Sequence, residues 1–479
     1  MTTRKHSRRD FIQQCLLSSA GLYGSSALIG NLNLVHAATA STRNFTDYRA
    51  LVCVYLEGGN DSVNTIVPRA SHPQRSVYEN QRSGGTSIVI PTSALETRPL
   101  AAVGAANQNY GLNPNLPDLY NLYQQQRLAF IANIGTLMQP TTKAQFIAQS
   151  VPLPPQLTSH SDQEQHWYTG ANNSVASTGW AGRVADLLGN AYQNPNLSMN
   201  VSLSKSTVFL TGASVLQYGL DPRGAGQISF PNDFQSGNDG SAKFNALRAL
   251  PQTNLLAQEY QRTMGRSINL AAEITSAIGP QSPLPADFNG LFQDEPTDYG
   301  GNELKAQLRM VARLIRARTA LNMKRQIFYV RLGGFDTHSG QLSDHRNGLA
   351  RLNNALRDFW TLLGRINMQN SVVSFTASEF GRTLNTNGDG TDHAWGGHQM
   401  VLGGAVIGQQ IIGNMPSLLL NGADSNDWGH TVPTLASDQY FATLARWYGV
   451  PEAQISTIFP NLSTFVNAGW LGNLGFLNA

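Results

Sequence analysis

The chain has 479 residues, with 33 basic and 30 acidic side chains and only two cysteines. Four of the basic residues and one acidic residue lie within residues 1–40, so the remaining chain carries 29 of each and is close to neutral. The basic isoelectric point therefore gives no support for nucleic-acid binding, and we expect no nucleic-acid partner. A chain of about 440 residues can supply a large hydrophobic core.

The first 40 residues have the order of features that is typical of a twin-arginine export signal. Arg8 and Arg9 precede an apolar stretch over residues 15–29, and residues 38–40 (Ala-Thr-Ala) offer small side chains to a signal peptidase. The apolar stretch is shorter than the ~20 residues that span a bilayer, so we expect no stable membrane anchor. We predict a twin-arginine signal peptide over residues 1–40, the Tat translocase as a partner during export, and a periplasmic or secreted protein.

The remaining residues, 41–479, contain no linker that divides them, and we predict one domain. Short runs rich in Val, Ile, Leu or Phe predict buried strands over residues 50–56, 128–133, 199–203, 326–332 and 371–376. Apolar residues at helical spacing predict helices over residues 304–315 and 349–363. Strands that alternate with helices predict a layered α/β fold with a mainly parallel central sheet.

The two cysteines do not form a pair in the exported chain. Cys15 lies in the predicted leader, so Cys53 would stand alone after cleavage, which excludes an intramolecular disulfide. Because Cys53 lies inside the first predicted strand, we interpret it as a core residue.

Polar clusters follow three of the predicted strands, at residues 57–62, 333–338 and 378–382, and a further cluster spans residues 391–398. In parallel sheets ligands bind at the carboxyl ends of the strands, so we expect these clusters to converge. Asp and His side by side suit Zn²⁺, and the carboxylates also accept Mn²⁺ or Ca²⁺. A hydrogen-bonded loop anchor is the alternative explanation for any single Asp–His pair.

These motifs resemble a bacterial family known as domain of unknown function 1501. The resemblance is carried by the export leader and by residues 56–61 (LEGGND), 333–338 (GGFDTH), 378–383 (SEFGRT), 392–398 (DHAWGGH) and 438–450. That family is similar to the alkaline phosphatase and sulfatase superfamily, whose members hold one or two metals over the edge of a mixed sheet. The resemblance therefore implies an alkaline phosphatase-like layered α/β/α fold with one or two divalent ions, Zn²⁺, Mn²⁺ or Ca²⁺.

Carried over residue by residue, the resemblance implies six metal ligands. They are Asp61, Asp336, His338, Asp392, His393 and His398. Two spacings depart from the superfamily's pattern, because Asp336 and His338 are only two residues apart and His398 follows the Asp-His pair very closely. Each departure is consistent with one altered or lost metal position. His430 is an alternative last ligand.

The resemblance also implies a nucleophile at a helix start, and Ser161 is the matching residue. A nearby metal would activate its hydroxyl. Because Ser161 stands three residues before Glu164, it also fits a helix N-cap, and both interpretations stay open. Glu379 and Arg382 follow a strand and are expected either to orient a ligand, to bind a phosphate or sulfate group, or to pair with each other.

The sequence thus predicts an exported metal-dependent hydrolase that acts on a small-molecule phosphate or sulfate ester. The uncertain nucleophile favours one alternative, a non-catalytic periplasmic binding or assembly protein that retains the fold, with or without a metal. Metal content and turnover of aryl phosphates and sulfates distinguish the two.

Overall fold

The computed structural model describes residues 45–100, 107–170, 177–189, 194, 197–224, 246, 249–280, 284–293 and 303–478. The predicted leader over residues 1–40 lies outside these ranges. Within them, none of the helices combines the length and the hydropathy needed to cross a bilayer.

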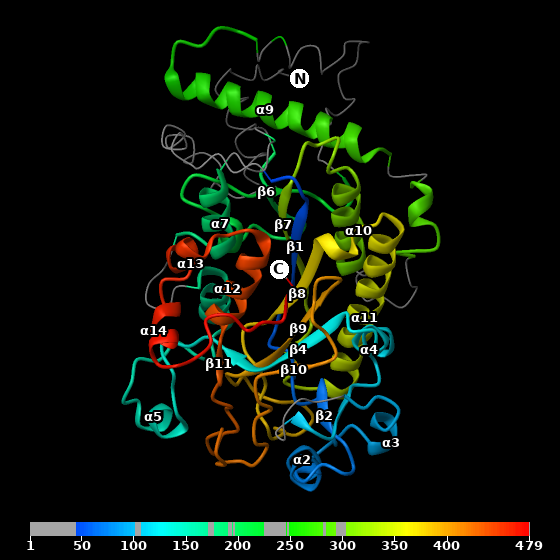
Figure 1. Ribbon diagram of the computed structural model, residues 1–479, viewed down its shortest axis with the longest axis vertical. Helices are drawn as coiled ribbons and strands as arrows, with labels where there is room; N and C mark the ends of the chain where they lie inside the picture. Colours follow the sequence, from blue (N-terminus) through cyan, green and yellow to red (C-terminus); the bar gives the residue numbers. More distant parts are fainter. Residues whose placement is uncertain are drawn as a thin grey trace, which may run out of the picture.

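A nine-stranded sheet forms the centre of the molecule (Figure 1). Eight strands follow the order β10 (Ile411–Ile412), β4 (Leu128–Gly135), β9 (Gly397–Gly403), β8 (Val372–Ala377), β1 (Arg49–Leu56), β7 (Arg325–Leu332), β5 (Asn200–Ser202) and β6 (Tyr218–Gly219), and β11 (Leu435–Ala436) pairs with β4. Only β9 runs antiparallel to its neighbours in this sheet. The predicted α/β class and mainly parallel sheet are confirmed. A separate two-stranded sheet joins β2 (Ile66–Pro68) to β3 (Tyr110–Leu112).

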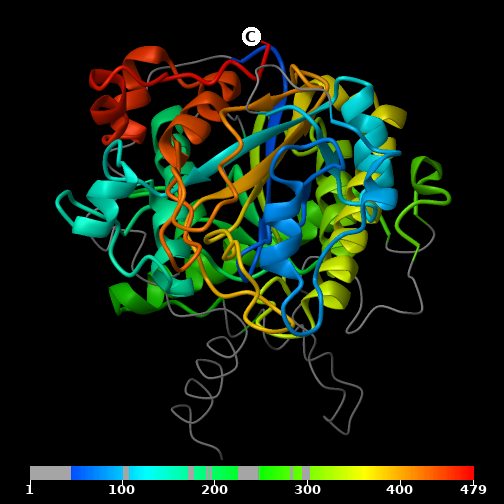
Figure 2. The same ribbon diagram turned by 90° about the horizontal axis from the view of Figure 1, so that it is seen from below.

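Helices cover both faces of the central sheet, as both views show (Figures 1 and 2). One face carries α4 (Pro117–Gln124), α10 (Glu303–Arg316) and α11 (Gln341–Arg365), and the other carries α7 (Trp180–Leu188), α12 (Ser437–Tyr448) and α13 (Glu452–Ile458). This double cover explains the continuous apolar runs, because a strand buried on both faces has no polar side. Every residue of β1 after Arg49 is buried.

The remaining elements lie around these layers. The other helices are α2 (Arg75–Arg82), α3 (Thr92–Leu95), α5 (Lys143–Ala148), α6 (His160–Thr169), α9 (Leu255–Ile278) and α14 (Leu462–Asn467). Short 3₁₀ turns span Val208–Leu210, Ala286–Phe288 and Gln369–Ser371. Cys53 is buried inside β1, as its position in an apolar run predicts.

The five predicted strands are all present with ends that differ by at most two residues, whereas the start of α11 and the strand β9 differ from the sequence prediction. Helix α11 begins at Gln341 instead of residue 349, because its first turns bury Gln341 and His345, which carry no apolar signal. Strand β9 is absent from the predicted strands, yet all its residues are buried. Its polar start, Gly397-His398-Gln399, hides the strand pattern.

The sheet brings the polar clusters to one edge. Strand β1 lies between β7 and β8, with Leu56 opposite Leu332 and Tyr55 opposite Ala377. Because all three strands run in the same direction, the segments that follow them leave the sheet side by side. Residues 57–61, 333–338 and 378–382 therefore start from a common rim.

Candidate metal centre

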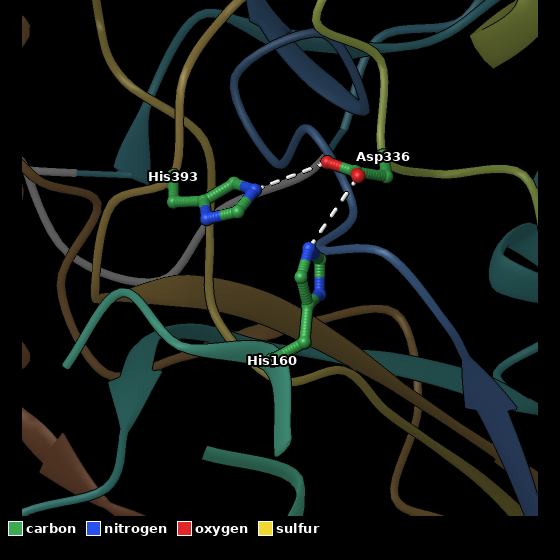
Figure 3. Close-up of side chains that lie close together, drawn as sticks. All are labelled: His160, Asp336 and His393. Atoms are coloured by element: carbon green, nitrogen blue, oxygen red, sulfur yellow. Dashed lines mark hydrogen bonds and ion pairs between the residues drawn. The ribbon is translucent and has the colours of Figure 1, made fainter. Parts of the chain in front are cut away.

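Four of the predicted ligands meet above this rim. Asp336 and His338 follow β7, while Asp392 and His393 belong to the loop between β8 and β9. A fifth residue, His160, joins them as the first residue of α6. Figure 3 shows His160, Asp336 and His393 pointing toward one another.

Three ligand atoms form a nearly equilateral triangle. Asp336 Oδ1 lies 3.1 Å from His338 Nε2 and 3.1 Å from His393 Nε2. The two imidazole nitrogens are 2.9 Å apart. Ligand atoms around one cation with bonds of about 2.1 Å are separated by about 3.0–3.4 Å. The triangle therefore has the dimensions of one coordination sphere.

The protonation of both imidazoles follows from their outer partners. His393 Nδ1 lies 2.8 Å from the carbonyl oxygen of Thr158, and His338 Nδ1 lies 3.0 Å from Asp392 Oδ1. A carbonyl and a carboxylate accept hydrogen bonds, so each Nδ1 has a partner to which it can donate, and the tautomer that does so leaves each Nε2 lone pair for a metal. Burial alone would raise the pKa of Asp392, but hydrogen bonds from Asn387 and His338 outweigh it and keep that pKa below its ordinary value.

Asp336 is held ionised at the centre of the cluster. Burial would raise its pKa, but the hydrogen bond from Arg382 and the positive charge of that guanidinium lower the pKa below its usual range. Burial lowers the pKa of His393, which keeps its ring neutral despite the opposing effects of Thr158 and Asp336. The site thus presents one carboxylate oxygen and two imidazole nitrogens to a common point, and these are donor types that transition metals accept.

His160 lies against the second oxygen of the same carboxylate. Its Nε2 is 3.4 Å from Asp336 Oδ2, and its Nδ1 is 3.4 Å from Glu379 Oε1. The hydrogen bond with Glu379 raises the pKa of His160, with burial acting in the opposite direction. One ligand atom each from His160, Asp336 and His393 lies within 4.8 Å of the others. His160 is therefore the fourth candidate ligand.

Arg382 and Glu379 support the cluster rather than face a ligand. The buried Arg382 guanidinium contacts Asp336 Oδ1 at 2.9 Å, the Thr391 carbonyl oxygen at 2.6 Å and the Gly58 carbonyl oxygen at 3.3 Å. These partners leave little of the guanidinium for an anion, which corrects the expectation of phosphate or sulfate binding. Glu379 does not pair with Arg382; its carboxylate accepts from the backbone N–H of Gly58 at 2.9 Å and of Gly59 at 3.1 Å.

Asp61 does not reach the cluster. It is fully buried, and its Oδ2 lies 2.5 Å from both Arg82 Nη1 and Gln341 Nε2. Its Oδ1 accepts from the backbone N–H of Val63 at 3.1 Å. The carboxylate turns inward to a buried arginine, so its placement corrects the expectation that Asp61 joins the other ligands.

His398 also lies away from the cluster. It sits in β9, where its Nδ1 accepts a hydrogen bond of 3.0 Å from the backbone N–H of Asn133 on the neighbouring strand. Burial lowers its pKa to about 4, so the ring is neutral. His398 thus joins two strands, and this corrects its predicted placement. His430, the alternative last ligand, is half-buried and interacts electrostatically with Asp392 and His393.

Ser161 lies in the first turn of α6 but is not its N-cap. Helix α6 begins at His160 and its N-cap is Ser159, so Ser161 is already the second helical residue. The Ser161 side chain is exposed, with its Oγ 3.3 Å from Ser159 Oγ and 3.4 Å from Asp162 Oδ2. Neither of these contacts reaches the cluster, so its role as nucleophile stays a prediction without geometric support.

Sequence reasoning missed the contribution of His160 and the carbonyl oxygen of Thr158. No predicted strand end precedes His160, so the strand-end argument does not reach it. The signal that could have found His160 is its position at the start of a helix. Side chains in the first turn point toward the N-terminal end of the helix, and this end faces the rim.

Comparison with known proteins places the chain in a family. The model described as "Protein of unknown function (DUF1501)" matches residues 48–441, which is most of the chain. The chain belongs to this family. Comparison with curated proteins gives no match.

Two solved structures show weak similarity to this DUF1501 protein. Ps i-CgsB in complex with k-i-k-neocarrahexaose is 10% identical, with a TM-score of 0.34 over 85% of this chain and 74% of the other. Ps i-CgsB alone is 9% identical, with a TM-score of 0.32 over 87% and 77%.

Gly58 tests how the rim positions Asp336. Its φ is +118°, and a Cβ there would lie 2.2 Å from the backbone nitrogen of Asp336. We expect Gly58→Ala to displace Asp336 and to weaken Zn²⁺ binding at least about tenfold in calorimetric titration. Gly475→Ala is the control, because its φ is +68° with nothing within 4 Å of the new Cβ. Unchanged Zn²⁺ affinity in Gly58→Ala would contradict this role.

Asp61→Asn separates a structural role from a ligand role. Removing the charge leaves Arg82 buried without its partner, so we expect a loss of about 3–5 kcal/mol in the free energy of unfolding. The metal affinity of the folded variant should be unchanged. Asp221→Asn removes a carboxylate whose partner, Arg223, is exposed, and should cost less than about 1 kcal/mol. Urea unfolding and metal titration check both; weaker metal binding by folded Asp61→Asn would restore Asp61 as a ligand.

Because two histidines are buried, we expect the stability of the folded protein to fall in acid. Burial lowers the pKa of His345 and of His398 to about 4. In the unfolded chain histidine titrates at about 6.5, so below that pH the unfolded state binds more protons. Stability should therefore be complete above about pH 6.5 and fall as the pH drops toward 4. Urea midpoints across this range check it, and a smaller decline is expected in His345→Gln.

Proposed function

We propose that this protein is an exported metal-dependent hydrolase of a phosphate or sulfate ester. The observation that supports it is the triangle of Asp336 Oδ1, His338 Nε2 and His393 Nε2, three acceptor atoms at 2.9–3.1 Å. Without a shared cation or proton, the facing lone pairs of two neutral imidazoles repel each other. A divalent ion removes that conflict.

The donor set favours one ion of borderline character. Two imidazole nitrogens and one carboxylate oxygen suit Zn²⁺ or Mn²⁺ better than Ca²⁺, which prefers oxygen ligands throughout. Asp336, His338 and His393 would hold the ion, and His160 is placed to complete the set. Asp392 and the Thr158 carbonyl oxygen orient the two rings through their Nδ1–H groups, as outer partners do in metal sites.

The chain's own groups determine what the site can do. Asp336, His338 and His160 are partly exposed, with side-chain exposures of 47%, 45% and 38%, so a substrate can approach the cluster. A bound divalent ion would supply positive charge that stabilises an anionic ester in its transition state. Arg382 fixes Asp336, and Glu379 fixes the Gly58–Gly59 turn beside it. The ester class follows from the motif resemblance described above.

Metal binding is the first test. After chelation and dialysis, we expect the protein to take up about one equivalent of Zn²⁺ or Mn²⁺ in calorimetric titration. His338→Ala and His393→Ala should each weaken binding at least about tenfold, because each removes a ligand. His72→Ala is the matched control, since the His72 ring accepts a hydrogen bond from Gln74 in its own loop and packs against Tyr110, and neither contact reaches the cluster. A protein that takes up neither ion overturns the proposal.

Turnover separates the hydrolase from the non-catalytic alternative. Aryl phosphates and aryl sulfates are assayed with the reconstituted protein and with metal-free protein. If hydrolysis requires the metal, disappears in His393→Ala and persists in His72→Ala, the result supports the hydrolase. If the protein binds one equivalent of metal but hydrolyses neither ester class, the result favours the binding or assembly protein.

A further inference from the structure

The loop over residues 417–431 presents two large apolar side chains to solvent. Trp428 is 71% exposed and Leu419 is 53% exposed. A tryptophan can bury about 150–250 Å², so leaving one in water forgoes a large favourable contribution to stability. On an ordered loop, such a side chain offers a large amphipathic face that a ligand can contact.

The backbone around Trp428 is fixed before any ligand arrives. The side-chain oxygen of Asn426 accepts hydrogen bonds from the backbone N–H of Trp428 at 3.1 Å and of His430 at 2.9 Å. Ser425 pairs with Thr431 as an isolated antiparallel bridge. Trp428 therefore sits at the tip of a closed turn, and a rigid tip lowers the entropic cost of binding.

This turn is packed against the loop that carries the metal ligands. The carbonyl oxygen of Gly429 accepts from the backbone N–H of Leu384 at 3.1 Å. Thr383, the preceding residue, pairs through its backbone N–H with the carbonyl oxygen of Asp392 at 3.0 Å. His430 interacts electrostatically with Asp392 and His393. Two backbone hydrogen bonds thus connect the turn of Trp428 to Asp392 in the candidate metal centre, and the turn lies on the same edge of the sheet.

We propose that Trp428 is a specificity-determining contact that stacks against a ring in the non-reacting part of the ester. This inference rests on the proposed function, because the metal centre would hold the anionic group while Trp428 holds the ring. The shared chemistry is a flat ring face, which either an aryl group or a sugar presents. Asp427 is exposed beside Trp428 and can accept hydrogen bonds from ring substituents.

Non-hydrolysable ligands test the contact without turnover. Methylphosphonate, phenylphosphonate and a hexose phosphonate are titrated into the Zn²⁺-loaded protein, with the corresponding sulfonates as a second series. We expect the ring-bearing ligands to bind more tightly than the methyl compound. Trp428→Ala should weaken binding of the ring ligands about three- to tenfold and leave methyl-ligand binding unchanged. Trp428→Phe should retain most of the affinity.

Control variants and ligands distinguish a failure of the ring contact from a failure of the metal centre. Leu471→Ala removes another side chain that is 66% exposed, from the C-terminal segment beside α12, and should change nothing. Methyl-ligand binding that does not depend on Trp428 supports the metal centre alone, and equal ring-ligand affinity in Trp428→Ala overturns the ring contact. If no methyl or ring ligand binds, the proposed function fails and this inference fails with it. A loss confined to the aryl or to the hexose ligand identifies the ring.

Discussion

The facing Nε2 atoms of His338 and His393 are the constraint on which the rest of the site depends. At 2.9 Å, with each Nδ1 committed to an acceptor, the two rings are unfavourable neighbours unless a positive charge lies between or beside them. Asp336 adds a third acceptor atom at 3.1 Å from both. Backbone and side-chain contacts, which do not depend on any ion, keep these three atoms close together.

Those contacts come from the order of strands in the sheet. Because β1 lies between β7 and β8, the turn that follows β1 stands between the two loops that carry the ligands. Glu379 after β8 accepts from the backbone of Gly58 and Gly59, and Arg382 joins Gly58 to Asp336. The three rim segments are thus tied to one another by buried charged groups, which are costly to bury and therefore hold their partners firmly.

The sequence supports the strands and part of the site, for different physical reasons. Apolar runs mark strands buried on both faces, so β1, β4, β7 and β8 were predictable. Asp336, His338, Asp392 and His393 follow strand ends or a Gly-rich loop, and the structure brings them together. Asp61 follows a strand in the same way, but its direction is set by Arg82, a residue from a distant helix. No local pattern reveals such a partner, nor the hidden strand around His398.

The position of Cys53 has a consequence for how the protein matures. Its thiol is enclosed within β1 between two neighbouring strands, where a second thiol has no access. The tertiary structure thus requires no oxidation step at Cys53 and can be completed in a reducing compartment.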